Sequence, residues 1–403
     1  MAGQILWKMI MLVRNDKKIS MLFTPVKIGS IELKNRFVRS ATVECLASKD
    51  NRLTEQYYKV YKRLAEGGVG LIIPGNYFIS SIGRAADKVL VIDRDDVIDD
   101  LRNLAGIVHC HGAKIVGQIN HCGRQGNPNL IGEQPVGPSQ VENKLTGITP
   151  REMSGHEIEQ TIEAFGSAAS RIRKAGFDGV QINGAHGYLV NQFLSSYTNR
   201  REDLWGGSLE NRMRFITRIY EEIRNHIGPG FPVLIKINGE DGVEGGINLK
   251  EAIEMSVKLE ALGFNAIEVS GGVYDAGFAT TKGDIPEELV ALFPEHLQKA
   301  SAFSEGYFLQ QAAEIKKKVS IPVIAVGGIR RREMMEQALL QGRADLIALS
   351  RPFIRQPNLV KQMEKGPDTD PIDCINCNRC TVEITLKYKP LRCYYSAKGD
   401  KTA

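Results

Sequence analysis

One local pattern recurs four times along this chain and constrains its fold more than any other feature. In each copy an amphipathic segment reaches a glycine, and a short, apolar, β-rich run follows. The copies cover residues 63–73, 173–182, 260–269 and 340–349. A helix that ends at a glycine and is followed by a buried strand is the repeating unit of α/β proteins with a parallel sheet.

The helix expected before residues 266–269 shows the spacing clearly, because Ala252, Met255, Leu259 and Leu262 form one apolar stripe. Eight runs are predicted as strands: Arg36–Ser40, Val69–Ile73, Lys114–Gln118, Gly179–Asn183, Val233–Ile237, Ala266–Val269, Pro322–Val326 and Asp345–Leu349. Eight strands alternating with helices predict an α/β fold, a (β/α)8 TIM barrel with inserted loops. A doubly wound sheet is the alternative, but no Gly-x-Gly-x-x-Gly follows the first strand.

The chain divides into three predicted parts. Residues 1–20 are expected to be an N-terminal extension, residues 21–365 the barrel, and residues 366–403 a short cysteine-rich C-terminal tail. The most apolar stretch, Ile5–Val13, contains Lys8 and is not followed by a small-residue cleavage site. A signal peptide is therefore the less favoured interpretation of the start.

Composition excludes several classes of protein. With 42% hydrophobic and 25% charged residues, the chain has the composition of a globular protein. Its net charge of +5 comes from scattered residues, which gives no reason to expect nucleic-acid binding. No apolar run approaches the ~20 residues of a membrane span. Seven cysteines in a chain of 403 residues do not resemble a secreted disulfide framework, so we expect a cytoplasmic protein.

The predicted ends of the strands carry polar side chains and glycines. In a (β/α)8 barrel the carboxyl ends of the strands form the active site. The last two strands end in Gly327-Gly328 and Ser350-Arg351. These are the positions at which barrels bind phosphate through glycine amides and an arginine. Taken alone, Gly327-Gly328 could be only a tight turn and Arg351 only a surface charge. Because they follow the last two predicted strands together, an anion site is favoured.

The residues at the end of the fourth predicted strand include more potential catalytic groups than those after the last two strands. Asn183, His186 and Tyr188 lie within six residues. A histidine and an amide can donate hydrogen bonds to one substrate oxygen, and a phenol can donate a proton. Structural hydrogen bonds that brace the loop are an equally good interpretation from these residues alone.

Several segments together resemble the Old Yellow Enzyme family of FMN-dependent NADH:flavin oxidoreductases. They are residues 22–25, 33–36, 184–189, 191–194 and 199–215, followed by Arg351-Pro352, and they span nearly the whole barrel. The cysteine tail makes the 2,4-dienoyl-CoA reductase-like branch the nearest in appearance. The flavin and pyridine-nucleotide domains that follow in those longer enzymes are not found in this sequence.

The resemblance implies contacts to FMN. Ala41 and Thr42 would contact the flavin ring, Asn76 would pack on it through its backbone, and Gln118 would bind its pyrimidine edge. Lys236 would support negative charge near N1 of the flavin. The phosphate would be held by three residues, in agreement with the anion site above: Gly328, Ser350 and Arg351.

The resemblance also implies the catalytic roles. Asn183 and His186 would bind the substrate carbonyl, and Tyr188 would protonate the substrate. Two donors at the carbonyl oxygen would stabilise the negative charge that builds there when a hydride adds to the β-carbon. The sequence departs from the family at three positions. Asn183 stands where histidine is more frequent, Lys236 replaces a commoner arginine, and Val43 stands where one branch has a redox-tuning cysteine.

The tail contains Cys374, Cys377, Cys380 and Cys393 in a C-x2-C-x2-C-x12-C arrangement. Four thiolates this close are typical of a metal or iron–sulfur site. In the resembling enzymes the third cysteine lies one residue later. A [4Fe-4S] cluster is the favoured prediction, with a zinc site or a metal-free tail as alternatives.

Together these features predict an FMN-dependent ene-reductase that uses NAD(P)H to reduce an activated alkene, an enoyl- or dienoyl-CoA thioester among the candidates. We expect a homo-oligomer, and an electron-donor protein as a partner if the cluster forms. Two alternatives remain open. One is a flavin/iron–sulfur electron-transfer subunit, and the other is a flavin-free barrel lyase or isomerase acting on a phosphorylated substrate.

Overall fold

The computed structural model describes residues 20–280, 286–298, 303–366 and 372–395, and the extension expected at residues 1–20 lies almost entirely outside them. Eight parallel strands form a closed ring, because β4 pairs with β3 on one side and with β6 on the other. In chain order the strands are β3 (Phe37–Arg39), β4 (Leu71–Ile72), β6 (Lys114–Asn120), β9 (Gly179–Gly184), β10 (Val233–Asn238), β11 (Ala266–Ser270), β12 (Val323–Val326) and β13 (Leu346–Leu349). Each predicted strand is present, and the (β/α)8 barrel is confirmed.

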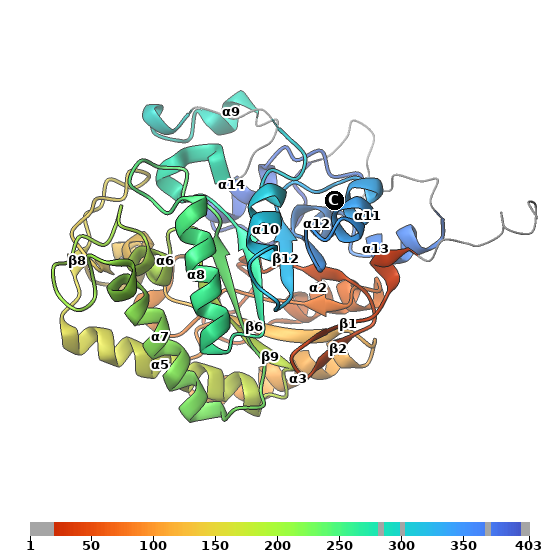
Figure 1. Cartoon of the computed structure of the whole chain (residues 1–403), viewed down its shortest axis with the longest axis horizontal. Coiled ribbons are helices and arrows are strands. Elements are labelled where there is room, and N and C mark those ends of the chain that lie inside the picture. Colours follow the sequence, from red (N-terminus) through yellow and green to blue (C-terminus); the bar gives the residue numbers. More distant parts are fainter. Residues whose placement is uncertain (1–19, 281–285, 299–302, 367–371, 396–403) are drawn as a thin grey trace, which may run out of the picture.

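Helices surround the strands. The principal ones are α2 (Glu55–Glu66), α3 (Ile98–His109), α5 (Gly155–Lys174), α7 (Leu209–Ile227), α8 (Leu249–Leu262), α10 (Leu309–Lys316) and α11 (Arg332–Leu340). Shorter elements are α4 (Pro128–Ile131), α6 (Leu189–Leu194), α9 (Glu287–Val290), α12 (Arg351–Arg355), α13 (Leu359–Glu364), α14 (Arg379–Thr385), β5 (Tyr77–Phe78), β7 (Val136–Gly137) and β8 (Arg151–Glu152). In Figure 1, α5 and α7 lie on one side of the strands, and α9 and α14 lie on the opposite side.

Local chemistry sets the limits of these helices. Ser154 accepts a hydrogen bond from the backbone of Glu157, whose carboxylate binds back to Ser154 N, so a capping box starts α5. Asn248 caps α8 in a similar way. Gly263 ends α8 with φ of 106°, a left-handed value that side chains disfavour. Of the predicted stripe on α8, Ala252, Met255 and Leu259 are buried, and Leu262 packs partly buried against the core.

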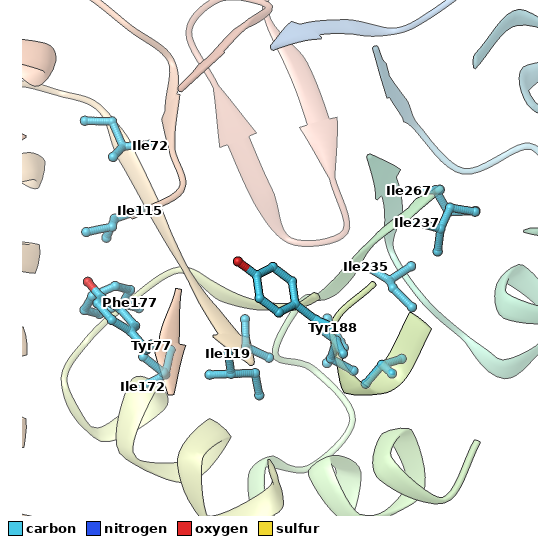
Figure 2. Packing of buried hydrophobic residues seen from close by; sticks show 14 of the residues in the cluster. Ile72, Tyr77, Ile115, Ile119, Ile172, Phe177, Tyr188, Ile235, Ile237 and Ile267 are labelled. Atoms are coloured by element: carbon cyan, nitrogen blue, oxygen red, sulfur yellow. The ribbon is translucent and has the colours of Figure 1, made fainter. Parts of the chain in front are cut away.

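The helices pack on the outside of the barrel through a large apolar cluster. Figure 2 shows Ile115 and Ile119 of β6 near Ile172 of α5. Gly117 permits this approach, because a Cβ there would lie 2.6 Å from Cδ1 of Ile172. Burying one such isoleucine contributes about 1.5–3 kcal/mol to folding.

Inside the barrel, apolar and polar layers alternate along the strands. An antiparallel hairpin, β1 (Val26–Ile28) and β2 (Ile31–Leu33), contributes Ile28, Ile31 and Leu33 to the apolar cluster that fills the amino-terminal end. Two residues further along the strands the buried inward positions become polar: Ser40, Gln118, Gln181, Lys236 and Glu268. The polar layer therefore lies toward the carboxyl ends, where barrels bind ligands.

Among the described residues, no helix combines the length and apolarity that crossing a membrane requires.

Candidate active site

Two adjoining cavities lie at the carboxyl ends of the barrel strands. We call them the central cavity, of about 180 Å³, and the glycine-loop cavity, of about 200 Å³. The residues that line both are Ala41, Thr42, His186, Lys236, Ser350, Arg351 and Thr381. All eleven residues predicted for the catalytic and FMN sites line one or both: Ala41, Thr42, Asn76, Gln118, Asn183, His186, Tyr188, Lys236, Gly328, Ser350 and Arg351. The structure thus brings the predicted residues together, whereas their roles remain predictions.

A buried ion pair lies next to these cavities, and its lysine, Lys236, lines both of them. Lys236 Nζ lies 3.1 Å from Oε1 of Glu268 and donates to Ser40 Oγ at 2.8 Å. Gln181 donates to the other oxygen of Glu268 at 2.9 Å and accepts from Gln118 at 2.7 Å. Because β10 and β11 place Lys236 opposite Glu268, the strand register itself creates the pair. The positive charge of Lys236 is thus neutralised by Glu268, and hydrogen bonds connect the polar side chains of this layer.

Asn183 is held by its neighbours. Its Nδ2 donates to Asn76 Oδ1 at 2.9 Å and to Gln118 Oε1 at 3.3 Å, and its Oδ1 accepts from the Ala185 N–H. Both amide hydrogens are therefore used. Donation from Asn183 to a substrate carbonyl requires exchange of one of these hydrogen bonds.

His186 lies next to Asn183 in a left-handed backbone conformation, with φ of 60°. Its backbone N–H donates to Asn238 Oδ1, and its ring Nε2 lies 2.7 Å from Ser270 Oγ. Burial, with the nearby charge of Lys236, lowers the pKa of His186 to about 3. The imidazole is therefore neutral at physiological pH and can act as a hydrogen-bond donor through one nitrogen.

Tyr188 precedes α6 and is buried. In Figure 2 its hydroxyl points away from the labelled side chains of Ile119 and Ile235. Burial and the adjacent Tyr274 phenol raise the pKa of Tyr188 well above 10, while a hydrogen bond with Asn76 opposes this. The two tyrosine rings meet edge to face with centroids 6.4 Å apart. Tyr188 therefore keeps its proton at neutral pH and is available as a proton donor.

The glycine-loop cavity has the groups of an anion site. Gly327 and Gly328 follow β12 with φ of 126° and 67°. A Cβ on Gly328 would lie 2.5 Å from Cε1 of Tyr307, so the cavity depends on glycine at this position. Arg351 Nη2 donates to the Tyr307 hydroxyl at 3.1 Å, and Ser350 Oγ lies 2.7 Å from Thr42 Oγ1. A fixed guanidinium beside two glycine amides can hold a phosphate dianion.

The described part of the cysteine tail covers this site. Leu391 N–H donates to Glu44 O at 2.7 Å, and Arg351 Nη1 donates to Asn378 Oδ1. Thr381 and Ile384 of α14 line the central cavity. The tail predicted from Gly366 onward therefore forms one wall of the site.

The four tail cysteines lie within electrostatic reach of one another. The pKa of the Cys380 thiol is raised to about 11, chiefly by burial and less by Cys374, Cys393 and Cys377, while the charge of Arg351 opposes the rise. In residues 372–395, as in the other described ranges, no three His, Cys, Asp or Glu side chains are arranged to hold a single metal ion. A four-iron cluster takes one thiolate on each iron, so its ligands need not converge on one point.

Several residues at the site were missed by the sequence analysis: Tyr274, Tyr307, Asn376, Thr381 and Thr385. Tyr274 and Tyr307 lie in or after the 272–305 region, which follows no readable motif. Gln181 and Glu268 could have been found, because each is a polar residue with an apolar neighbour on either side in its strand, and strand alternation points it inward.

A closed parallel barrel whose carboxyl end gathers the predicted catalytic residues and a candidate anion site is typical of barrel oxidoreductases and lyases that bind phosphorylated ligands. Residues 21–370 match the model of the NADH:flavin oxidoreductase / NADH oxidase family, and the chain belongs to this family, the Old Yellow Enzyme group.

Three relatives illustrate the match. The chain is 38% identical to an NADH oxidase of Thermoanaerobacter brockii over 89% of this chain and 52% of that protein. A 2-naphthoyl-CoA reductase structure in complex with 2-naphthoyl-CoA is 28% identical with a TM-score of 0.83, over 93% of this chain and 56% of that one. An Old Yellow Enzyme homologue from Zymomonas mobilis is 27% identical with a TM-score of 0.72, over 88% and 95%. The chain thus spans about half the length of the curated relatives it matches first. The 2,4-dienoyl-CoA reductase branch remains a prediction.

Proposed function

We propose that this chain is an FMN-dependent ene-reductase that reduces the C=C bond of an α,β-unsaturated carbonyl compound with electrons from NAD(P)H. One observation carries the proposal. Two neutral side chains suited to donate to a carbonyl, Asn183 and His186, share a cavity with the protonated phenol of Tyr188, and the anion site adjoins it. This is the set of groups that polarising an enone and protonating its α-carbon require.

The residues fit FMN. The glycine-loop cavity offers Arg351 and two glycine amides to the phosphate, and Gln118 and Asn76 offer amide groups to the ring. FMN, when bound, supplies the hydride that adds to the β-carbon, and NAD(P)H restores it. Lys236 would support negative charge on the ring, an effect that Glu268 reduces by pairing with it.

The side chains of the central cavity act on the substrate. His186 and Asn183 donate to the carbonyl oxygen, Asn183 after releasing Asn76 or Gln118. Negative charge develops on that oxygen as the hydride adds, so these hydrogen bonds are stronger in the transition state than in the bound substrate and lower the barrier. Tyr188 then transfers its proton to the α-carbon, and solvent reprotonates it.

A third cavity, the distal cavity of about 340 Å³, extends the substrate space beyond Tyr188. It shares Val43, Tyr188, Tyr274 and Thr385 with the central cavity. None of the described residues that line it carries a formal charge. The cavity therefore favours a neutral, largely apolar substituent on the alkene. In a CoA thioester, the charged nucleotide would have to lie outside it.

The test is spectroscopic and kinetic. Purified chain, or apoprotein supplied with FMN, should show a flavin spectrum that NAD(P)H bleaches under anaerobic conditions. A panel of neutral enones, cinnamate-like acids and enoyl-CoA esters should then restore it, with neutral enones fastest. A colourless protein that takes up no FMN would favour the barrel lyase or isomerase. A flavin that is reduced but is reoxidised by no alkene would favour the electron-transfer subunit.

We further propose that Cys374, Cys377, Cys380 and Cys393 bind a [4Fe-4S] cluster, supported by their C-x2-C-x2-C-x12-C spacing. Anaerobically purified protein should contain about four irons per chain, one for each thiolate, with broad visible absorbance beneath the flavin bands. Zinc without iron, or no metal, would overturn this proposal. A partner electron-donor protein, a homo-oligomer and a cytoplasmic location remain predictions.

A further inference from the structure

Asn376 has a half-satisfied side chain in the middle of the cysteine tail. It is 2% exposed, and its backbone is left-handed with φ of 55°, which asparagine tolerates. Its Oδ1 accepts a weak hydrogen bond from Cys374 Sγ at 3.6 Å. Its Nδ2 has no hydrogen-bond partner. A buried amide donor without a partner is rare in native proteins, so its place requires an explanation.

The orphaned amide belongs to the glycine-loop cavity. Asn376 lines this cavity together with Gly327, Gly328, Ser350 and Arg351. Among the described residues with an unpartnered buried side-chain atom, Asn376 alone lines it. The neighbouring polar groups bind one another: Arg351 contacts Tyr307 and Asn378, and Ser350 contacts Thr42. The amide donor without a partner therefore belongs to a residue that lines the cavity in which the proposed anion would bind.

We propose that the Asn376 amide is a ligand of the FMN phosphate and selects FMN over unphosphorylated riboflavin. The inference rests on the proposed function, because it needs FMN in this cavity. Arg351 supplies a positive charge, and Asn376 adds a side-chain N–H donor from the segment that contains the tail cysteines. A hydrogen bond between an amide and a phosphate oxygen is charge-assisted and stronger than a neutral one.

The same geometry connects the tail to the flavin site. Asn376 lines the glycine-loop cavity and Asn378 accepts a hydrogen bond from Arg351, so the loop between Cys374 and α14 contributes to the phosphate site at two positions. A change that stabilises the ordered conformation of this loop should therefore raise the affinity for FMN. FMN binding should stabilise the ordered loop in return, because linkage between two sites is reciprocal.

The test measures flavin affinity of the apoprotein by quenching of flavin fluorescence. Asn376→Gly removes the amide and keeps a backbone that accepts positive φ without strain. It should raise the Kd for FMN about 10- to 100-fold, the range expected for one hydrogen bond to a charged group, and leave the Kd for riboflavin nearly unchanged. Asn376→Asp should weaken FMN more, because a carboxylate repels the phosphate. Asn51→Gly, at another left-handed asparagine outside the three cavities, is the matched control and should change neither Kd.

Each outcome decides between explanations. Equal loss of FMN and riboflavin affinity in Asn376→Gly would mean that the amide only orders the tail, and no loss would mean that it binds nothing; either result overturns the inference. Wild-type protein that binds neither flavin would instead overturn the proposed function, and the inference with it.

Discussion

Substitution of Gly328 by alanine should weaken FMN binding indirectly, by displacing Tyr307, which need not contact the cofactor itself. Gly328 has φ of 67°, and a Cβ there would lie 2.5 Å from Cε1 of Tyr307. The Tyr307 ring must move, and its hydroxyl is the acceptor for Arg351 Nη2 at 3.1 Å. Gly342 offers a matched control, because it has φ of 64° and no atom lies within 4 Å of the position that a Cβ would take there.

The two substitutions separate strain from steric displacement. Left-handed backbone costs an L residue roughly 1–2 kcal/mol, so both variants should lose about that much stability through backbone strain. Only Gly328→Ala also disturbs a hydrogen bond to a charged group, worth about 1.5–3 kcal/mol, or about 10- to 100-fold in affinity for the anion that Arg351 binds.

The assay compares the FMN Kd of the two apoproteins by fluorescence quenching, together with the free energy of unfolding of each. We expect both variants to lose stability, Gly328→Ala more than Gly342→Ala because the Tyr307 ring must also move, and only Gly328→Ala to show a weaker Kd. If Gly342→Ala binds FMN as weakly as Gly328→Ala, or if neither differs from wild type, the reasoning from Tyr307 to Arg351 is refuted.

Four further predictions concern the titratable groups. Tyr188→Phe should slow reoxidation of the reduced flavin by an enone about 10²- to 10⁴-fold and leave reduction by NAD(P)H intact in stopped-flow traces; equal loss in both half-reactions would contradict its role. His186 has its pKa lowered to about 3, so reoxidation rates should show no histidine inflection between pH 5 and 8. Burial raises the pKa of Glu44 from 4.5 to about 7, so the folded state holds its proton more tightly than the unfolded one; stability should fall as pH rises across that interval, and Glu44→Gln should flatten the dependence in urea unfolding. Glu268→Gln leaves Lys236 without its carboxylate and should raise the flavin reduction potential measured by spectroelectrochemistry; an unchanged potential would place Lys236 away from the ring.

The barrel was predictable because its signals are local. Each repeat of helix, glycine and apolar run contains its own helix stop, as Gly263 shows, and its own strand. The position of Lys236, Asn183 and Arg351 at one end of the barrel follows from strand polarity alone. Sequence reasoning succeeded where the site is made by the ends of regular strands.

The rest of the site depends on contacts between distant segments. Asn376 reaches the cavity only because the tail folds back over β13, and Tyr274 meets Tyr188 through a loop without regular pattern. No local periodicity encodes either approach. The ion pair of Lys236 and Glu268 is an intermediate case, since it requires knowing which strands are neighbours and in what register.

The wall that the tail adds to the cavity has a consequence for the order of assembly during synthesis. Ala41, which follows the first barrel strand, and Thr385, from α14, line the same space. A nascent chain still lacking residues 372–385 would have a barrel whose cofactor cradle is open on one side. We expect tight capture of the cofactor to await the emergence of residues 372–385 from the ribosome, so that flavin retention would report the docking of this segment on the barrel.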